Sequence, residues 1–271
     1  MKKITEPYIF AFDMDGTLLN SKKEISRKTA RFLRKLQQKG HHVVIASGRP
    51  PRSIKRYYEQ LKLDTPIVCY NGELTYSPVD PTFKTVKRPF PKEIVLEVID
   101  KVGPNALNVM CEGDTDIWVD KEDTYLGNFF WYEGMDLHHG NLKDILDKDT
   151  MTCLIHCPEE YRTAHEIEKI VEKWPDILSI FWIGKPYFEL HHKDATKGDG
   201  LKSIAEHYGI PKERIIAFGD ATNDIEMFEF AGTSVLMSNA KYDISEKATM
   251  VSVKDNDHDG IYHTLKQILN V

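Results

Sequence analysis

Hydrophobic residues in the first part of the chain alternate between short apolar runs and stretches at helical spacing. The runs at 8–12, 41–46 and 66–69 have the length of short strands. Between them, residues 26–39 and 52–61 read as helices, with Ala30, Leu33 and Leu36 on one face of the first and Gly40 at its end. A repeated order of strand, helix and strand predicts a parallel sheet.

The pattern changes in the middle of the chain and then returns. From about residue 83, helical segments at 91–101 and 161–174 lie among hairpin-like pieces such as 109–119. The alternation resumes with a helix at 197–208, a strand at 214–218 and a helix at 224–231. We therefore expect an α/β fold: a Rossmann-like parallel sheet core flanked by helices, built from 1–82 and 187–271, with a smaller α+β domain inserted at 83–186.

Composition and charge narrow the class of protein. The chain has 271 residues, of which 41% are hydrophobic and 29% charged, as in folded globular proteins. A formal net charge of -6 argues against a nucleic-acid partner. The run at 8–12 is too short for a signal peptide and no apolar stretch is long enough to span a bilayer, so we expect a cytoplasmic protein with no membrane partner. The four cysteines lack paired spacing, which favours buried free thiols: Cys69, Cys111, Cys153 and Cys157.

Two acidic residues follow the first predicted strand. Asp13 and Asp15 lie two residues apart, a spacing that can direct both side chains into one crevice while Gly16 lets the backbone turn. A carboxylate nucleophile divides a phosphoryl displacement into two easier steps, and a second carboxyl can protonate the leaving oxygen and later deprotonate water. This chemistry assigns attack to Asp13 and proton transfer to Asp15.

A second acidic cluster follows another apolar strand. Gly219-Asp220 and Asn223-Asp224 should reach the same edge of the sheet, because ligands of open parallel sheets bind at the carboxyl ends of the strands. Carboxylates crowded around a phosphate dianion repel one another, so we expect a divalent cation. Mg²⁺ prefers oxygen ligands of this kind, supplied by Asp13, Asp220 and the main-chain carbonyl of Asp15, with Asp224 as an auxiliary ligand.

A calcium-binding loop is the main alternative for the first motif. An EF-hand needs further acids and a glutamate within twelve residues, whereas Leu18 and Leu19 follow here at once and no helix pair flanks the site. We therefore do not adopt the calcium interpretation.

Four motifs taken together carry a family resemblance. They are Asp13-Met-Asp-Gly-Thr17, Ser47-Gly48-Arg49, Lys197-Gly198, and Gly219-Asp220 with Asn223-Asp224. In this order they resemble the haloacid dehalogenase superfamily of phosphatases. The long insertion between Ser47 and Lys197 is similar to the large C2-type cap of its Cof-type branch.

The resemblance implies roles for individual residues. Asp13 would form an aspartyl-phosphate, Asp15 would act as general acid and base, and both would lie at the Mg²⁺ with Asp220. Ser47 and Lys197 would bind the phosphoryl oxygens, where an ammonium offsets the charge that develops during transfer. Taken alone, Ser47 would suit a turn and Lys197 a solvated helix start.

Other polar residues admit two interpretations. Asn223 can bind the phosphoryl group, cap the following helix, or do both. Arg49 and Asn71 can orient substrate or tie loops together. The segment 256–260 reads equally as a loop near the site or as an exposed acidic turn.

The functional hypothesis is Mg²⁺-dependent hydrolysis of small phosphorylated metabolites such as sugar phosphates, making this a phosphoric monoester hydrolase. A phosphotransferase or phosphomutase would pass the phosphoryl group to another alcohol. A non-catalytic sensor of a phosphometabolite is the alternative from another class, because a fold does not compel chemistry. The small-molecule phosphate ester is the expected partner, and neither its identity nor the oligomeric state follows from the sequence.

Overall fold

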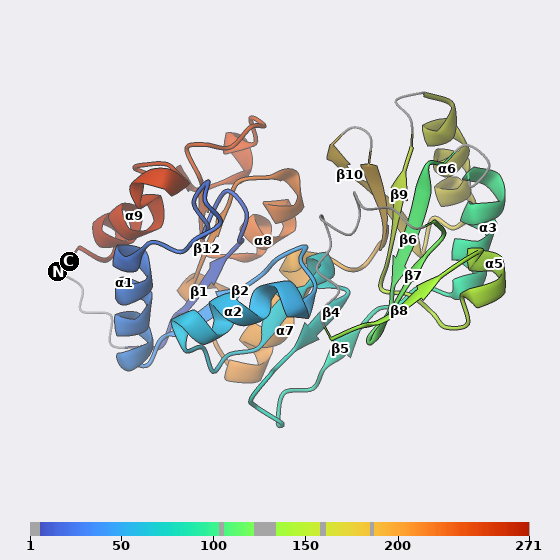
Figure 1. Ribbon diagram of the computed structural model, residues 1–271. Helices are drawn as coiled ribbons and strands as arrows, with labels where there is room; N and C mark the ends of the chain where they lie inside the picture. The colour runs from blue at the N-terminus through green and yellow to red at the C-terminus, as the bar shows by residue number, and fades with distance from the viewer. Residues whose placement is uncertain (1–5, 103–105, 122–133, 158–160, 185–186, 271) are drawn as a thin grey trace. The chain divides into compact units, whose positions relative to one another are not determined.

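The chain divides into two compact units. The computed structural model describes residues 6–102, 106–121, 134–157, 161–184 and 187–270 (Figure 1). The first unit combines Met1–Val86 with Thr196–Val271, and the second comprises Lys87–Ala195. No helix within the described part of the chain is long and apolar enough to cross a membrane.

A five-stranded parallel sheet forms the centre of the first unit, in the order β14-β13-β12-β1-β2. Its strands are β1 (Ile9–Phe12), β2 (His42–Ile45), β12 (Ile215–Gly219), β13 (Thr233–Leu236) and β14 (Met250–Val251). The order confirms the predicted parallel sheet. β1 lies between β12 and β2, and all its residues are buried, as in a strand covered on both faces.

Helices flank this sheet. They are α1 (Arg27–Gln38), α2 (Pro51–Leu61), α7 (Lys197–Tyr208), α8 (Ile225–Phe230) and α9 (Gly260–Leu269). Ile9 and Ala11 of β1 pack in one cluster with Leu201 of α7 and Met227 of α8. α1 lies beside α9 (Figure 1). Ser26 caps the start of α1, because its side chain accepts a hydrogen bond from Thr29 N.

The third predicted strand departs from the parallel sheet. β3 (Ile67–Cys69) belongs to a separate sheet with β4 (Leu74–Tyr76) and β5 (Val86–Lys87), and it pairs antiparallel with β4. A single parallel bridge, Ala46 to Val68, links it to the segment after β2. The short turn between β3 and β4 returns the chain at once, so β3 takes its full pairing from β4.

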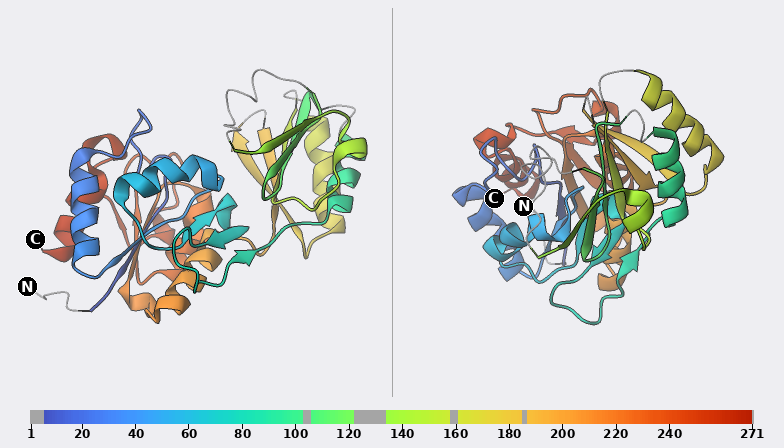
Figure 2. Two further views of the ribbon diagram at one scale, coloured as in Figure 1. Left: turned by 60° about the horizontal axis from the view of Figure 1, so that its bottom comes forward. Right: turned by 45° about the vertical axis from the view of Figure 1, so that its right-hand side comes forward.

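The second unit is a six-stranded sheet with helices on one face (Figures 1 and 2). The strand order is β10-β11-β9-β6-β7-β8, all antiparallel except β7 with β8. The strands are β6 (Asn108–Glu112), β7 (Asp116–Val119), β8 (Asp136–His139), β9 (Thr152–His156), β10 (Leu178–Gly184) and β11 (Tyr187–His192). The helices are α3 (Lys92–Val102), α5 (Leu142–Ile145) and α6 (Tyr161–Lys173).

The boundaries of this unit differ from the expected 83–186. Phe83 packs in the core of the first unit, which moves the start to Lys87. β11 pairs with both β9 and β10, so residues 187–192 belong to the inserted sheet and the first unit resumes at Thr196. The four cysteines are free and buried, which confirms that prediction.

Candidate active site

Asp13 and Lys197 form the centre of the site in the first unit. Asp13 directly follows β1, where its N–H donates to Phe218 O of β12 at 2.9 Å, and it is 6% exposed. Lys197 opens α7, and its side chain has no exposed surface. The Lys197 ammonium donates to Asp13 Oδ1 at 2.6 Å and to Asp224 Oδ1 at 2.7 Å. The structure therefore replaces the solvated-lysine interpretation with a buried cation between two carboxylates.

Asp224 fixes this lysine and the loop after β12 together. Its Oδ2 accepts hydrogen bonds from the N–H of Asp220 at 2.9 Å and of Ala221 at 3.0 Å, while Oδ1 faces Lys197. Both oxygens are thus engaged, and the side chain is fully buried. This geometry suits a residue that positions its neighbours.

Three carboxylates converge at this point. Asp13, Asp220 and Asp224 each offer an oxygen, and these oxygens lie within 4.8 Å of one another. Burial, followed by the charges of neighbouring acids, raises the pKa of Asp13 well above its usual value even though Lys197 opposes the shift. Burial and the Asp224 charge raise the pKa of Asp220 to about 6. The site is therefore short of positive charge, and this donor set fits a divalent cation such as Mg²⁺.

Gly16 makes room for Asp220. Its φ is +83°, a conformation that side chains disfavour, and an added Cβ would lie 2.3 Å from Asp220 Oδ2. Thr17 Oγ1 donates to Asp220 Oδ1 at 2.9 Å. The Gly-Thr pair of the first motif thus shapes and orients the carboxylate of the last one.

Asp15 faces a different set of partners. Arg49 Nε donates to Asp15 Oδ2 and Arg49 Nη2 to Asp15 Oδ1, both at 2.6 Å, and Lys23 Nζ donates to Oδ1 at 2.6 Å. Burial opposes the shift, but hydrogen bonds and charge from Arg49, then from Lys23, lower the pKa of Asp15. Its carboxylate lies outside the acidic group, which leaves the main-chain carbonyl as the expected metal ligand; that expectation stays a prediction.

Ser47, Asn71 and Asn223 join three loops at the carboxyl edge of the sheet. Ser47 is 2% exposed, and its carbonyl accepts from Asn71 N at 3.0 Å. Its Oγ accepts from Arg49 N at 3.2 Å. Asn223 Nδ2 donates to Asn71 Oδ1 at 2.9 Å. The sequence left open whether Asn71 orients substrate or joins loops, and in the structure it joins the loops that carry Ser47 and Asn223. Phosphoryl binding by Ser47, Lys197 and Asn223 stays a prediction.

Two asparagines brace the loop after Asp13, and one of them, Asn239, had no readable signal in the sequence. Asn239 Nδ2 donates to Gly16 O at 2.8 Å, and its Oδ1 accepts from Asn256 N at 3.1 Å. Asn256 Nδ2 donates to Leu19 O at 2.8 Å. The segment 256–260, which the sequence left between two interpretations, therefore begins with a residue that braces the loop after Asp13.

A polar cavity of about 440 Å³ opens beside Asp15 and Asp220. Every described residue that lines it is a glycine or carries a charged, amide or hydroxyl group. Lys23 and Lys241 supply its cations. The cavity can therefore hydrate or hydrogen-bond a polar group next to the carboxylates.

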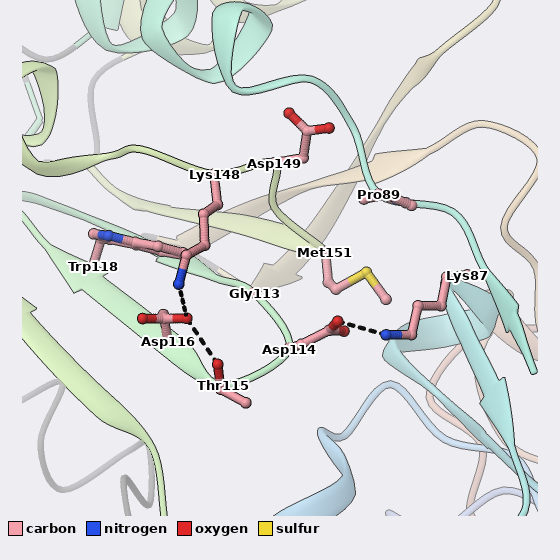
Figure 3. Close-up of a pocket in the computed structure, with 10 residues that line it drawn as sticks. All are labelled: Lys87, Pro89, Gly113, Asp114, Thr115, Asp116, Trp118, Lys148, Asp149 and Met151. Carbon is pink, nitrogen blue, oxygen red and sulfur yellow. Dashed lines mark hydrogen bonds and ion pairs between the residues drawn. The ribbon is translucent and has the colours of Figure 1, made fainter.

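A second cavity, of about 250 Å³, lies within the inserted unit (Figure 3). Its two lysines are already paired, Lys148 with Asp116 at 2.8 Å and Lys87 with Asp114 at 2.5 Å. Trp118 on its wall is buried. The other aromatic side chains that the sequence places nearby in the chain, at 129–131 and 181–182, lie outside the described residues. The charges around this cavity are thus balanced in lysine–aspartate pairs, whereas the cluster around Asp13 is short of positive charge.

Comparison with known proteins agrees with this site. Residues 10–265 match the family described as haloacid dehalogenase-like hydrolase. The chain is 34% identical over 270 residues to the 5-amino-6-(5-phospho-D-ribitylamino)uracil phosphatase YitU of Bacillus subtilis, covering 98% of this chain and 99% of that protein. It is 26% identical over 271 residues to the pyridoxal phosphate phosphatase YbhA of Escherichia coli, with 93% and 95% covered.

A solved structure has the same fold. TM0651 from Thermotoga maritima superposes with a TM-score of 0.81 at 29% identity, covering 97% of each chain. Its likeness extends over both units of this chain. Fold, site and relatives agree, and the chain belongs to the haloacid dehalogenase-like hydrolases, as a phosphatase of their Cof-type branch.

Proposed function

We propose that this phosphatase hydrolyses small phosphomonoesters through an aspartyl-phosphate on Asp13, with Mg²⁺ as cofactor. The observation that carries the proposal is the cluster of Asp13, Asp220 and Asp224, in which Lys197 bridges the two buried carboxylates of Asp13 and Asp224. A cluster with raised carboxyl pKa values and one buried ammonium is suited to binding a divalent cation and a phosphate group together.

The reaction proceeds in two steps. An oxygen of Asp13 attacks phosphorus, the bond from phosphorus to the ester oxygen breaks, and Asp15 gives its proton to the departing alcohol. Asp15 then takes a proton from water, whose oxygen attacks the phosphorus of the aspartyl-phosphate and releases inorganic phosphate with regenerated Asp13.

Cations and hydrogen-bond donors must offset the negative charge on the phosphoryl oxygens during both steps. Lys197 and the hydroxyl of Ser47 would contact the phosphoryl oxygens, and Asn223 would add an amide donor. Mg²⁺ held by Asp13, Asp220 and the Asp15 carbonyl, with Asp224 behind them, would neutralise oxygens of the same group. Lys197 would keep its proton throughout, because the two carboxylates raise its pKa despite its burial.

The polar cavity beside Asp15 suggests the kind of leaving group. Its wall offers hydrogen-bond donors and acceptors, which suit a hydroxylated chain better than an apolar ring. The relative YitU is named for an ester in which a ribityl chain carries the phosphate. We propose 5-amino-6-(5-phospho-D-ribitylamino)uracil as the first substrate to test, with ribitol 5-phosphate as its simplest analogue.

The test measures phosphate release from p-nitrophenyl phosphate, ribitol 5-phosphate, the ribitylaminouracil ester, glucose 6-phosphate and pyridoxal phosphate. Asp13→Asn should abolish release from every ester, and removal of Mg²⁺ by a chelator should do the same. Asp243→Asn is the matched control, because Asp243 is exposed and its carboxylate accepts hydrogen bonds from the hydroxyl and the main-chain N–H of nearby Ser245, away from the cluster. Robust turnover by Asp13→Asn, or in excess chelator, would exclude this mechanism.

The same assay separates the alternatives. Adding a competing alcohol and analysing products would reveal a phosphotransferase, since a second phosphate ester would form in place of inorganic phosphate. A folded protein that binds these esters yet cleaves none of them, p-nitrophenyl phosphate included, would instead be a sensor.

A further inference from the structure

Both oxygens of Asp15 are bound by side-chain donors. Arg49 forms a planar fork, with Nε on Oδ2 and Nη2 on Oδ1, and Lys23 adds a second donor on Oδ1. A carboxylate has about four lone-pair positions, two on each oxygen. Oδ1 therefore uses both of its positions, while Oδ2 keeps one.

Asp13 and Asp15 have separate cations. Lys197 binds Asp13 Oδ1, whereas Arg49 and Lys23 bind Asp15. Two cations on one carboxylate exceed what charge balance requires. An ion pair that is half open to solvent also adds little stability, and the Asp15 side chain is 40% exposed. The arrangement is better explained by the orientation that it imposes on the carboxyl plane.

The two cations are themselves held in place. Tyr57, 2% exposed, donates its hydroxyl proton to Lys23 O at 2.8 Å, and its ring lies 5.8 Å from the Arg49 guanidinium. Lys23 has a φ of +58° in a turn whose N–H groups at Lys22 and Glu24 donate to Asn20 Oδ1. A turn and a buried ring thus aim both donors at Asp15.

We propose that Arg49 is a positioning residue for proton transfer, holding Asp15 so that the free position on Oδ2 faces the oxygen of the departing alcohol. The inference rests on the proposed function and goes beyond it, since it assigns a role to Arg49 and an atom to the transfer. Arg49 and Lys23 favour the ionised carboxylate, so protonated Asp15 is a strong acid. Its proton moves from Oδ2 to the ester oxygen as the phosphorus–oxygen bond breaks, and water returns a proton to Oδ2 in the second step. Proton transfer requires hydrogen-bond reach in a defined direction, and a fork with two parallel bonds provides that direction.

Leaving groups of different acidity provide the test. 2,4-Dinitrophenolate departs without a proton, whereas the alkoxide of ribitol 5-phosphate needs one. The value of kcat/KM reports every step up to departure of the alcohol, so it is the quantity to compare. Arg49→Met should lower kcat/KM for ribitol 5-phosphate about 10- to 100-fold, at or below the lower end of the range for general acid catalysis because Asp15 itself remains. It should change kcat/KM for 2,4-dinitrophenyl phosphate less than about threefold.

Two further variants sharpen the comparison. Arg49→Lys should recover only part of the loss, because an ammonium cannot form the fork. Arg34→Met is the matched arginine control; Arg34 donates to Ala30 O within α1, and both substrates should be cleaved normally. Lys23→Met removes one donor from Oδ1 but keeps the fork, so it should give a smaller effect in the same direction, and it tests the idea should Arg49→Met fail to fold.

Contrary outcomes are distinct. An equal fall on both substrates would mean that Arg49 binds the phosphoryl group or supports the fold, and it would overturn the positioning role. Unchanged kcat/KM on both substrates in folded Arg49→Met would overturn it as well. If the unsubstituted protein cleaves neither substrate, the proposed hydrolysis itself fails, which is a separate result.

Discussion

Asp220→Asn should make the metal-free protein more stable and at the same time inactive. The carboxyl of Asp220 has a pKa of about 6 in the folded protein against 3.8 for the free side chain. Each unit is equivalent to about 1.4 kcal/mol, so ionised Asp220 destabilises the fold by about 3 kcal/mol at neutral pH. Asparagine removes this charge, and its amide oxygen can still accept the hydrogen bond from Thr17.

The raised pKa of Asp220 also determines how the free energy of unfolding changes with pH. Between about pH 4 and pH 6 the folded protein keeps a proton on Asp220 that the unfolded chain has lost, so the free energy of unfolding falls as the pH rises. Asp220→Asn should flatten this part of the curve. Mg²⁺ should stabilise the unsubstituted protein at pH 7, by about 2.7 kcal/mol at one hundred times its dissociation constant, and the variant much less.

The assay is urea unfolding of the full chain in chelator, followed by far-UV circular dichroism and by tryptophan fluorescence. All 4 tryptophans lie in 87–195, so fluorescence follows the inserted unit, whereas circular dichroism follows both units. A variant no more stable than the parent at pH 7, or one with the same slope between pH 4 and 6, would refute the electrostatic reasoning.

The remaining predictions concern the same cluster. Gly16→Ala should abolish activity, because its Cβ would displace Asp220. Gly40 also has a positive φ, +84°, but nothing lies within 4 Å of its added Cβ, so Gly40→Ala should cost only about 1 to 2 kcal/mol of stability and keep activity. Equal effects of the two substitutions on phosphate release would contradict this. Lys197→Met should lower the free energy of unfolding in chelator by about 3 kcal/mol, since it leaves buried Asp13 without its cation. Denaturant titration at pH 7 measures this, and a stability equal to that of the parent would be the contrary result.

Much of the first unit was predictable because its strands are short continuous apolar runs and its amphipathic helices repeat apolar residues at helical spacing. Asp13, Ser47 and Asp220 each follow a strand of the predicted sheet, and the parallel register brings the strand ends together. The motif residues could therefore be placed at one edge before their contacts were known.

Other features depend on contacts that periodicity does not encode. The run 187–192 reads as a strand, but its letters do not tell which sheet it joins, and pairing with β9 decides that. Lys23, which a turn holds at positive φ, donates to Asp15, and Asn239 donates to Gly16 across more than two hundred residues. Single polar residues in loops carry no repeat from which such partners could be inferred.

The central position of β1 has a consequence for synthesis of the chain. Ile9 pairs with Ile215, about 200 residues later, and the whole inserted unit lies between them. A ribosome needs on the order of 10 to 40 s to add 200 residues. During that interval β1 has β2 on one side and an unpaired edge on the other, an edge that can recruit strands of other chains.

The inserted unit can fold meanwhile and shorten the loop that β12 must close. Lys197 emerges only after that unit is complete, so a nascent chain acquires its buried cation and its central sheet almost together.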